Sequence, residues 1–261
     1  MSNTLFNYYK KHGFVLIRNF FDSNDKSIIA NVANRLYNSP DLKGNENSSC
    51  RKYYENTING NRILSRMEKV CKVHSKFNKY INPKVNSVLN NYEGKNMVLF
   101  KDKLNWKLPG GGAFRPHQDF QAWSDFPPKY YVSCAIFIDE CTIDNGCLEM
   151  AEDNRHEGLI KYNETDRCLE SDLTDKMNWV PILAKPDDLV IFDAFVPHRS
   201  GVNNTNHSRG VFYLTYNESK YGDFYEEYFK RKWHEFPPDI DRTDNTELDL
   251  NSKYNFANPI S

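Results

Sequence analysis

Hydrophobic and polar positions alternate differently in successive parts of the chain. Residues 14–21 are almost continuously apolar and predict a strand that enters a turn. Asp22 or Ser23 follows and predicts the cap of a helix, because apolar residues then recur every three or four positions up to Tyr37. The chain is therefore expected to begin with a strand and a helix.

The next segment changes character twice. Residues 38–62 are rich in Asn, Ser, Gly and Lys, which predicts a loop. A second helical pattern runs from about residue 64 to 89 and is interrupted near Pro83. The N-terminal part is thus expected to form a helical layer.

Short strands are predicted from residue 97 onward. They cover residues 97–108, 130–139, 146–150, 188–192 and 209–216. Turn residues separate them at intervals that are typical of an all-β sandwich or barrel. We expect one domain over residues 1–261, with a β core at about 97–217 and a polar tail from about 221.

The first of these strands has two distinct faces, because side chains alternate along a strand. Its polar face carries Lys101, Lys103, Asn105 and Lys107, and its apolar face carries Leu104, Trp106 and Leu108. We therefore expect the apolar face of this strand to pack in a core and its polar face to present the lysines on the other side.

Composition excludes several classes of function. The 261 residues include 34 Lys and Arg against 35 Asp and Glu, so bulk charge does not predict binding to nucleic acid or to anionic membranes. No apolar run is long enough for a membrane span, and the start lacks a secretory signal pattern. The six cysteines form no CxxC pair, which favours reduced thiols in a cytoplasmic protein over a structural zinc site.

The most informative residues are His117 and Asp119, which follow a glycine-rich turn. Two positions apart on an extended segment, they project to the same side and can reach one ion. With His198, after an apolar strand, they match the facial triad of non-haem Fe(II) oxygenases. Arg209, eleven residues further on, suits bidentate binding of a carboxylate. Zinc is an alternative metal for the same three ligands, but an oxo-acid clamp explains the arginine better.

These residues resemble the phytanoyl-CoA dioxygenase superfamily of Fe(II)/2-oxoglutarate-dependent oxygenases. The stretches that carry the resemblance are 13–20, 116–119, 145–149, 186–190, 197–201 and Arg209. The resemblance implies a double-stranded β-helix, the cupin-like jelly roll, with the N-terminal helices packed on one sheet. It also implies iron at His117, Asp119 and His198, 2-oxoglutarate at Arg209, Ser200 and Asn105, and O2 as the oxidant.

Within the superfamily the chain is most similar to organophosphonate hydroxylases, which act on 2-aminoethylphosphonate or its N-methylated relatives at the carbon next to phosphorus. The similarity lies mainly in residues 99–112, 132–134, 145–149 and 215–217. The substrate contacts that it suggests are Lys101, Lys103, Lys107, Gln118, Trp123, Arg51 and Tyr53. Arg51, Tyr53 and Tyr54 lie in a segment that is expected to fold over the pocket. Glu55, Asp125 or aromatic faces such as those of Trp123 and Tyr53 would contact an amine. His156 is a further candidate contact, in a loop that lacks the family's usual Pro-Gly-Ser.

Several alternatives stay open at this point. Each lysine could be a solvated surface charge. Trp123 could be core packing, and Gln118 could support the metal ligands from behind or could be solvated. The substrate could instead be a compatible solute, an amino acid or a small lipid, and a non-catalytic jelly-roll binding protein is a further possibility. The sequence does not predict an oligomeric state.

Overall fold

The computed structural model describes residues 3–41, 50–57, 59–153, 158–164, 167–243, 246 and 252–254. Within them, eleven strands pair antiparallel in two sheets. The strands are β1 (Phe14–Ile17), β2 (Arg51–Asn56), β3 (Arg62–Glu68), β4 (Met97–Lys107), β5 (Phe114–His117), β6 (Tyr131–Phe137), β7 (Leu148–Glu152), β8 (Asn178–Pro181), β9 (Leu189–Asp193), β10 (His198–Ser200) and β11 (Arg209–Glu218). The larger sheet has the order β1-β9-β6-β11-β4-β3-β2, and the smaller one has the order β5-β10-β7-β8.

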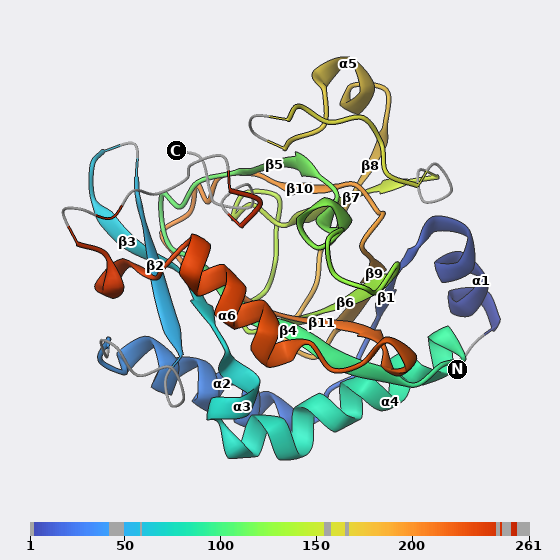
Figure 1. Ribbon diagram of the computed structural model, residues 1–261, viewed down its shortest axis with the longest axis horizontal. Helices are drawn as coiled ribbons and strands as arrows, with labels where there is room; N and C mark the ends of the chain where they lie inside the picture. Colours follow the sequence, from blue (N-terminus) through green and yellow to red (C-terminus); the bar gives the residue numbers. More distant parts are fainter. Residues whose placement is uncertain are drawn as a thin grey trace.

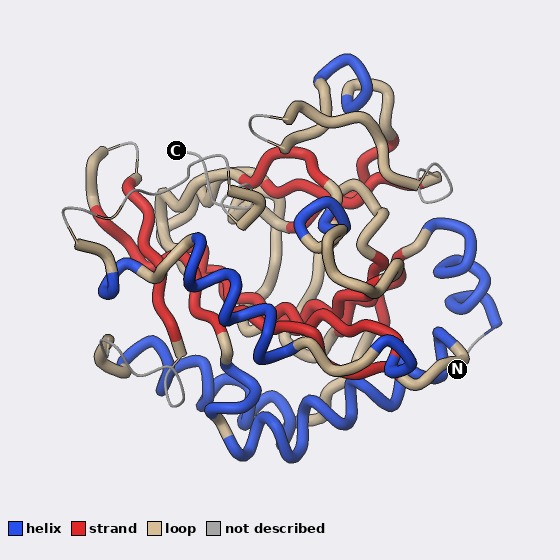
Figure 2. The backbone as a smooth tube through the Cα atoms, in the orientation of Figure 1, coloured by secondary structure: helices blue, strands red, loops and turns tan. Residues whose placement is uncertain are grey.

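Helices cover one face of the larger sheet and cross its edge. They are α1 (Asn3–His12), α2 (Ser23–Asn38), α3 (Val70–Val73), α4 (Asn82–Glu93), α5 (Ser171–Thr174) and α6 (Tyr225–Glu235), with shorter turns η1 (Phe77–Ile81), η2 (Asp119–Ala122), η4 (Ser219–Tyr221) and η5 (Asp239–Asp241). Figure 1 shows α2, α3 and α4 as a layer beneath the larger sheet, with α6 running past β4. Figure 2 shows the same division, with the helices α2, α3 and α4 below the larger sheet and the smaller sheet above it.

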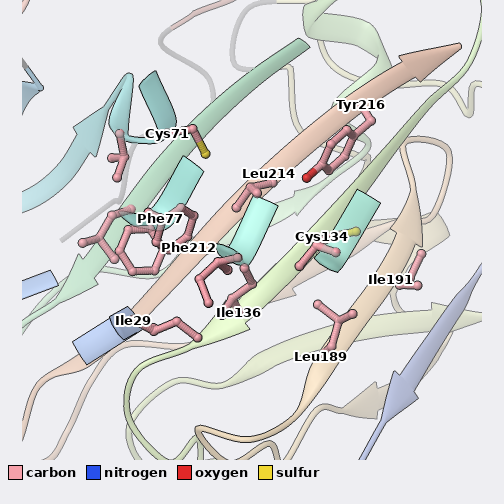
Figure 3. Close-up of a cluster of buried hydrophobic side chains, with 14 of the residues drawn as sticks. Ile29, Cys71, Phe77, Cys134, Ile136, Leu189, Ile191, Phe212, Leu214 and Tyr216 are labelled. Atoms are coloured by element: carbon pink, nitrogen blue, oxygen red, sulfur yellow. The ribbon is translucent and has the colours of Figure 1, made fainter. Parts of the chain in front are cut away.

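The main core lies between the helical layer and the larger sheet. Phe77 packs its ring 4.8 Å from that of Phe212, and Ile29 of α2 belongs to the same cluster as Ile136 and Leu189 (Figure 3). Alternate residues of each strand therefore face this core, and the intervening ones face the smaller sheet. This arrangement confirms the expected helices on one sheet of a β core.

The start of α2 follows from its capping residues. Asp22 accepts a hydrogen bond from the backbone of Asp25, and Asp25 accepts one from the backbone of Asp22, which is the reciprocal capping box. The predicted cap is therefore confirmed at Asp22.

Three predictions of secondary structure are wrong. Residues 51–56 form β2 within the predicted loop, and residues 62–68 form β3 where a helix was expected to begin. Both are polar strands whose pairing with each other and with β4 is a tertiary effect. Pro83 lies in the first turn of α4, directly after η1, and the backbone stays helical through Ile81 and Asn82, so the helix changes its hydrogen-bonding pattern there but does not break.

The C-terminal segment also differs from its expectation as a polar tail. Residues 225–235 form α6, which buries Tyr225, Tyr228, Phe229 and Lys232. Charged residues interrupt the apolar positions of α6, so the sequence does not show that one face of the helix is buried. In the structure that face packs against β4. No helix among the described residues has the length and apolar character that a bilayer crossing needs.

Candidate active site

Three potential metal ligands meet between the two sheets. His117 ends β5 and His198 begins β10, and the two residues are direct partners in the antiparallel pair. Asp119 follows two residues after His117, at the start of η2. One ligand atom from each residue lies within 4.8 Å of the others, and all three residues are buried. The strand pairing therefore assembles the triad that the sequence predicts.

The backbone orients both imidazoles. Nδ1 of His117 lies 2.6 Å from the carbonyl oxygen of Arg115, and Nδ1 of His198 lies 3.0 Å from that of Val196. A carbonyl only accepts, so each Nδ1 carries the proton and each Nε2 keeps its lone pair for a ligand. His198 Nε2 lies 4.0 Å from Asp119 Oδ2.

The protonation states suit a cation. Burial, followed by the neighbouring His198, lowers the pKa of His117 to about 3, and burial also lowers the pKa of His198. Burial alone would raise the pKa of Asp119, but His198, Lys101 and Lys103 together lower it. Two neutral imidazoles and one carboxylate result at neutral pH, which is a competent donor set for a divalent metal.

A cavity of about 470 Å³ opens beside the triad. Asn105, Ser200 and Arg209 line it together with the three potential ligands. Arg209 Nε and Asn105 Oδ1 are buried and have no hydrogen-bond partner among the described residues. A buried polar atom without a partner is costly, so these two atoms are suited to a bound polar molecule.

Lys101 and Lys103 project from β4 into the same cavity. Lys101 is buried and Lys103 is half-buried within the cavity lining, so the alternative that they are solvated surface charges is wrong. Burial and the charge of Lys103 lower the pKa of Lys101 to about 7, and burial lowers the pKa of Lys103. Neither ammonium has a hydrogen bond or ion pair among the described residues; each lies over an aromatic ring instead.

Lys107 occupies a different position from the one expected for a substrate contact. It is buried behind the cavity and is not among the lining residues. Its Nζ donates to Ser200 Oγ at 2.9 Å and to the carbonyl of Gly201. Burial, followed by the charge of Arg209, lowers its pKa to about 6. Lys107 therefore positions Ser200 beside Arg209.

Trp123 is both a core residue and a cavity residue. Its ring packs 5.7 Å from Phe100 and 5.2 Å from Tyr131, and it lines a second cavity next to Asp119. The ammonium of Lys101 lies 4.2 Å from the ring centroid. Lys101 Nζ therefore already lies over the ring face of Trp123 that was expected to contact an amine of the substrate.

Gln118 is neither a cavity residue nor solvated. Its side chain is fully buried and meets only backbone: it donates to the carbonyls of Gly158 and Phe195 and accepts from the N–H of Ile160. Gln118 and its neighbour His117 point to opposite sides of an extended segment, so the ligand faces the cavity while the amide ties down the loop behind it. This corrects its assignment as a substrate contact.

Arg51 and Tyr53 do not reach either cavity. Arg51 pairs with Asp241 at 3.5 Å, and the hydroxyl of Tyr53 donates to the carbonyl of Phe236 at 3.0 Å. Both contacts join β2 to the chain that follows α6. These residues were expected to fold over the pocket, but β2 is the outermost strand of its sheet, and the C-terminal segment packs on it.

The remaining candidates for an amine also lie outside the cavities. Tyr54 donates to Asp41 at 2.8 Å, and Asp125 is exposed and pairs with Arg231 at 3.5 Å. Burial raises the pKa of Glu55 to about 6, but Glu55 does not line a cavity. His156 lies outside the described residues.

Residues that the sequence reading missed line the second cavity. Arg66 and Glu68 stand opposite Asn105 and Lys103 in the pairing of β3 with β4, so their side chains share the polar face of β4. Lys232 reaches the same cavity from α6. The available signal was the alternation of polar Arg66, apolar Met67 and polar Glu68, but it is short and lies within a segment whose wider pattern predicts a loop followed by a helix.

The fold and the buried triad define the class of protein: a jelly roll with a candidate metal site between its two sheets. The chain belongs to the phytanoyl-CoA dioxygenase (PhyH) family, which it matches over residues 9–211. It is therefore an enzyme of the dioxygenase type, and the non-catalytic alternative is not supported.

Relatives and solved structures agree with this membership. The chain is 32% identical to the 2-aminoethylphosphonate dioxygenase of uncultured bacterium HF130_AEPn_1, over 97% of this chain and 95% of the relative. It is 33% identical to the methylphosphonate hydroxylase of Gimesia maris, over 60% and 59% of the two chains. EctD from S. alaskensis, solved with 2-oxoglutarate and 5-hydroxyectoine, superposes with a TM-score of 0.67 at 17% identity, over 84% of this chain and 77% of EctD. The last likeness concerns the fold and confirms the expected jelly roll.

Proposed function

We propose that this protein is an Fe(II)- and 2-oxoglutarate-dependent dioxygenase that hydroxylates a small phosphonate. The best candidate substrate is 2-aminoethylphosphonate or an N-methylated relative, at the carbon next to phosphorus. The observation that carries the proposal is one buried cavity that holds a His-Asp-His donor set, an arginine and two lysines. The names of the two phosphonate-acting relatives support the substrate class.

The residues present fit the metal. His117, Asp119 and His198 offer two imidazole nitrogens and a carboxylate oxygen from one side, which leaves the cavity side free for other ligands. Bound Fe(II) would supply the activation of O2 that couples oxidative decarboxylation of 2-oxoglutarate to hydroxylation. The backbone carbonyls that accept from each Nδ1 keep both imidazoles in the ligating tautomer.

The far end of the cavity fits a dicarboxylate. Arg209 would bind the carboxylate remote from the metal, with Ser200 donating a second hydrogen bond and Lys107 holding Ser200 in place. Asn105 lies on the strand between this end and the lysines, and its side-chain Nδ2 would donate to the same cosubstrate. The burial of all these groups excludes water and strengthens the electrostatic attraction.

Lys101 and Lys103 would bind the phosphonate. They lie on the same face of β4 as Asn105, but towards Asp119, so an anion held there would keep its adjoining carbon close to the metal position. One buried and one half-buried lysine, neither with an ion pair among the described residues, favour an anionic substrate over an uncharged one.

The test is anaerobic reconstitution with Fe(II), followed by O2 and 2-oxoglutarate, with succinate as the product measured. We expect succinate to depend on 2-aminoethylphosphonate, its N-trimethyl derivative or methylphosphonate, and a hydroxylated phosphonate to form in equal amount. His117→Ala should abolish turnover, whereas His207→Ala changes an exposed histidine outside the cavity and serves as its control. Turnover of a compatible solute or amino acid with none of any phosphonate would refute the substrate class.

A further inference from the structure

A second cavity of about 330 Å³ adjoins the candidate metal site and is richer in cations than the first. Its charged lining residues are Arg66, Glu68, Lys101, Lys103, Asp119, Lys232 and Lys253. Lys101, Lys103 and Asp119 also line the first cavity, so the two spaces meet beside the potential metal ligands.

Arg66 and Lys232 come from distant parts of the chain and meet at Glu68. Arg66 Nε lies 3.0 Å from Glu68 Oε1, and Lys232 forms an ion pair with the same oxygen. Both cations also lie over the ring of Tyr53, at 4.6 Å and 4.5 Å from its centroid. One carboxylate therefore serves two buried cations that are held side by side.

The charges around this cavity do not balance. Glu68 can neutralise only one of Arg66 and Lys232, and Lys101 and Lys103 have no ion pair among the described residues. Nη2 of Arg66 is buried and has no hydrogen-bond partner there. Burial and the charge of Arg66 lower the pKa of Lys232, which reflects the cost of crowding these cations. An anion with several acceptor oxygens would relieve that cost.

We propose that Arg66 and Lys232, together with Lys101, form the site that binds the doubly charged head group of the substrate and sets the enzyme's preference for a dianion. This inference rests on the proposed function and names the residues that select its substrate. Arg66 would bind two oxygens of the head group, and the lysines would each bind one as point charges. The preference follows because a singly charged head group leaves one buried cation uncompensated.

The position of Lys232 in the chain supports a role in selectivity. Helix α6, residues 225–235, lies beyond the region 9–211 that matches the family, whereas the triad and Arg209 lie within it. A helix outside the region that matches the family therefore supplies one of the residues that we propose recognise the substrate. Tyr53 would act as the platform on which both cations are positioned.

The experiment compares two ligands that differ in charge but not in shape. 2-Aminoethylphosphonate is a dianion at its head group at mildly alkaline pH, and taurine carries the corresponding tetrahedral monoanion. Each is titrated by calorimetry into the anaerobic protein loaded with Fe(II) and 2-oxoglutarate. We expect the wild-type protein to bind the phosphonate at least about tenfold more tightly than taurine.

Variants then locate the preference. Arg66→Gln and Lys232→Met should each weaken phosphonate binding by at least about tenfold and taurine binding much less, so that the ratio falls. Arg66→Lys keeps a charge and should lose less than Arg66→Gln. The controls are Arg62→Gln on the same strand and Lys230→Met on the same helix, both exposed and outside the cavity.

The outcomes separate this inference from the proposed function. Equal affinity of the wild-type protein for phosphonate and taurine would overturn the dianion site, even if a variant failed to fold. An unchanged ratio in folded variants that bind 2-oxoglutarate normally would overturn the assignment to Arg66 and Lys232. Tight binding of the dianion O-phosphoethanolamine, lost in both variants, without turnover of any phosphonate would support the site while refuting the proposed substrate.

Discussion

One of the buried contacts that attach α6 to the β core is a hydrogen bond that can be removed by deleting a single oxygen atom. The hydroxyl of Tyr225 donates to Oδ2 of Asp102 at 2.7 Å, and both residues are almost fully buried. Burial raises the pKa of Asp102, and this hydrogen bond limits the rise because it favours the ionised form. Tyr225→Phe deletes the donor and leaves the apolar ring in place, so the lost contribution is mainly that of the bond.

The expected cost follows from the charge and burial of the acceptor. A hydrogen bond to a charged group contributes about 1.5–3 kcal/mol, and Asp102 keeps the backbone N–H of Val70 as a second donor, so the loss should stay within that range. For a chain of roughly this length, 1 kcal/mol corresponds to a change in Tm of about 2–4 °C. Tyr225→Phe should therefore lower Tm by roughly 3–12 °C.

Thermal unfolding followed by circular dichroism measures this change. Tyr80→Phe is the matched control, because Tyr80 is 48% exposed and its replacement should change the free energy of unfolding by less than about 0.5 kcal/mol. Since α6 carries Lys232, Tyr225→Phe should also weaken binding of the phosphonate more than binding of 2-oxoglutarate. A Tm equal to that of the wild type and of the control would refute the reasoning.

Three further predictions concern the candidate site. Fe(II) at about 100 times its Kd should raise the free energy of unfolding of the anaerobic protein by about 2.7 kcal/mol, and its Tm should rise accordingly. The rise in Tm should be absent in Asp119→Ala, and a variant that keeps it would contradict the ligand set. Arg209→Gln should raise the KM for 2-oxoglutarate by roughly 10–150-fold in steady-state assays, and an unchanged KM would argue against the carboxylate clamp. The pKa of Lys107 is lowered from 10.5 to about 6, so between these values the unfolded chain binds more protons and stability should rise with pH by up to about 1.4 kcal/mol per unit. Lys107→Met should remove that part of the slope in urea unfolding, and an identical slope would be inconsistent with a buried lysine there.

Local patterns predicted the parts of this protein that depend on neighbours in the chain. The cap at Asp22, the polar and apolar faces of β4 and the His-x-Asp spacing are set by periods of two or of three to four residues. The triad with Arg209 was predictable because each of its members has a distinctive residue type at the end of a readable strand. The family and its jelly-roll fold followed from the same residues.

The sequence by itself therefore determined the helical layer, most of the β core, and the residues proposed to hold the metal and cosubstrate. Only the tertiary structure decided what surrounds the substrate position, because those contacts join β2, β3 and β4 to α6 across long stretches of chain. The side chain of Gln118 hydrogen-bonds to the backbone, and that of Lys107 hydrogen-bonds to Ser200. The tertiary structure decides these contacts, because the direction of a strand in the folded sheet sets whether a side chain faces the cavity or lies behind it. Arg66 and Lys232 became neighbours because packing places both beside Glu68, and no periodicity within a single segment encodes a contact between segments.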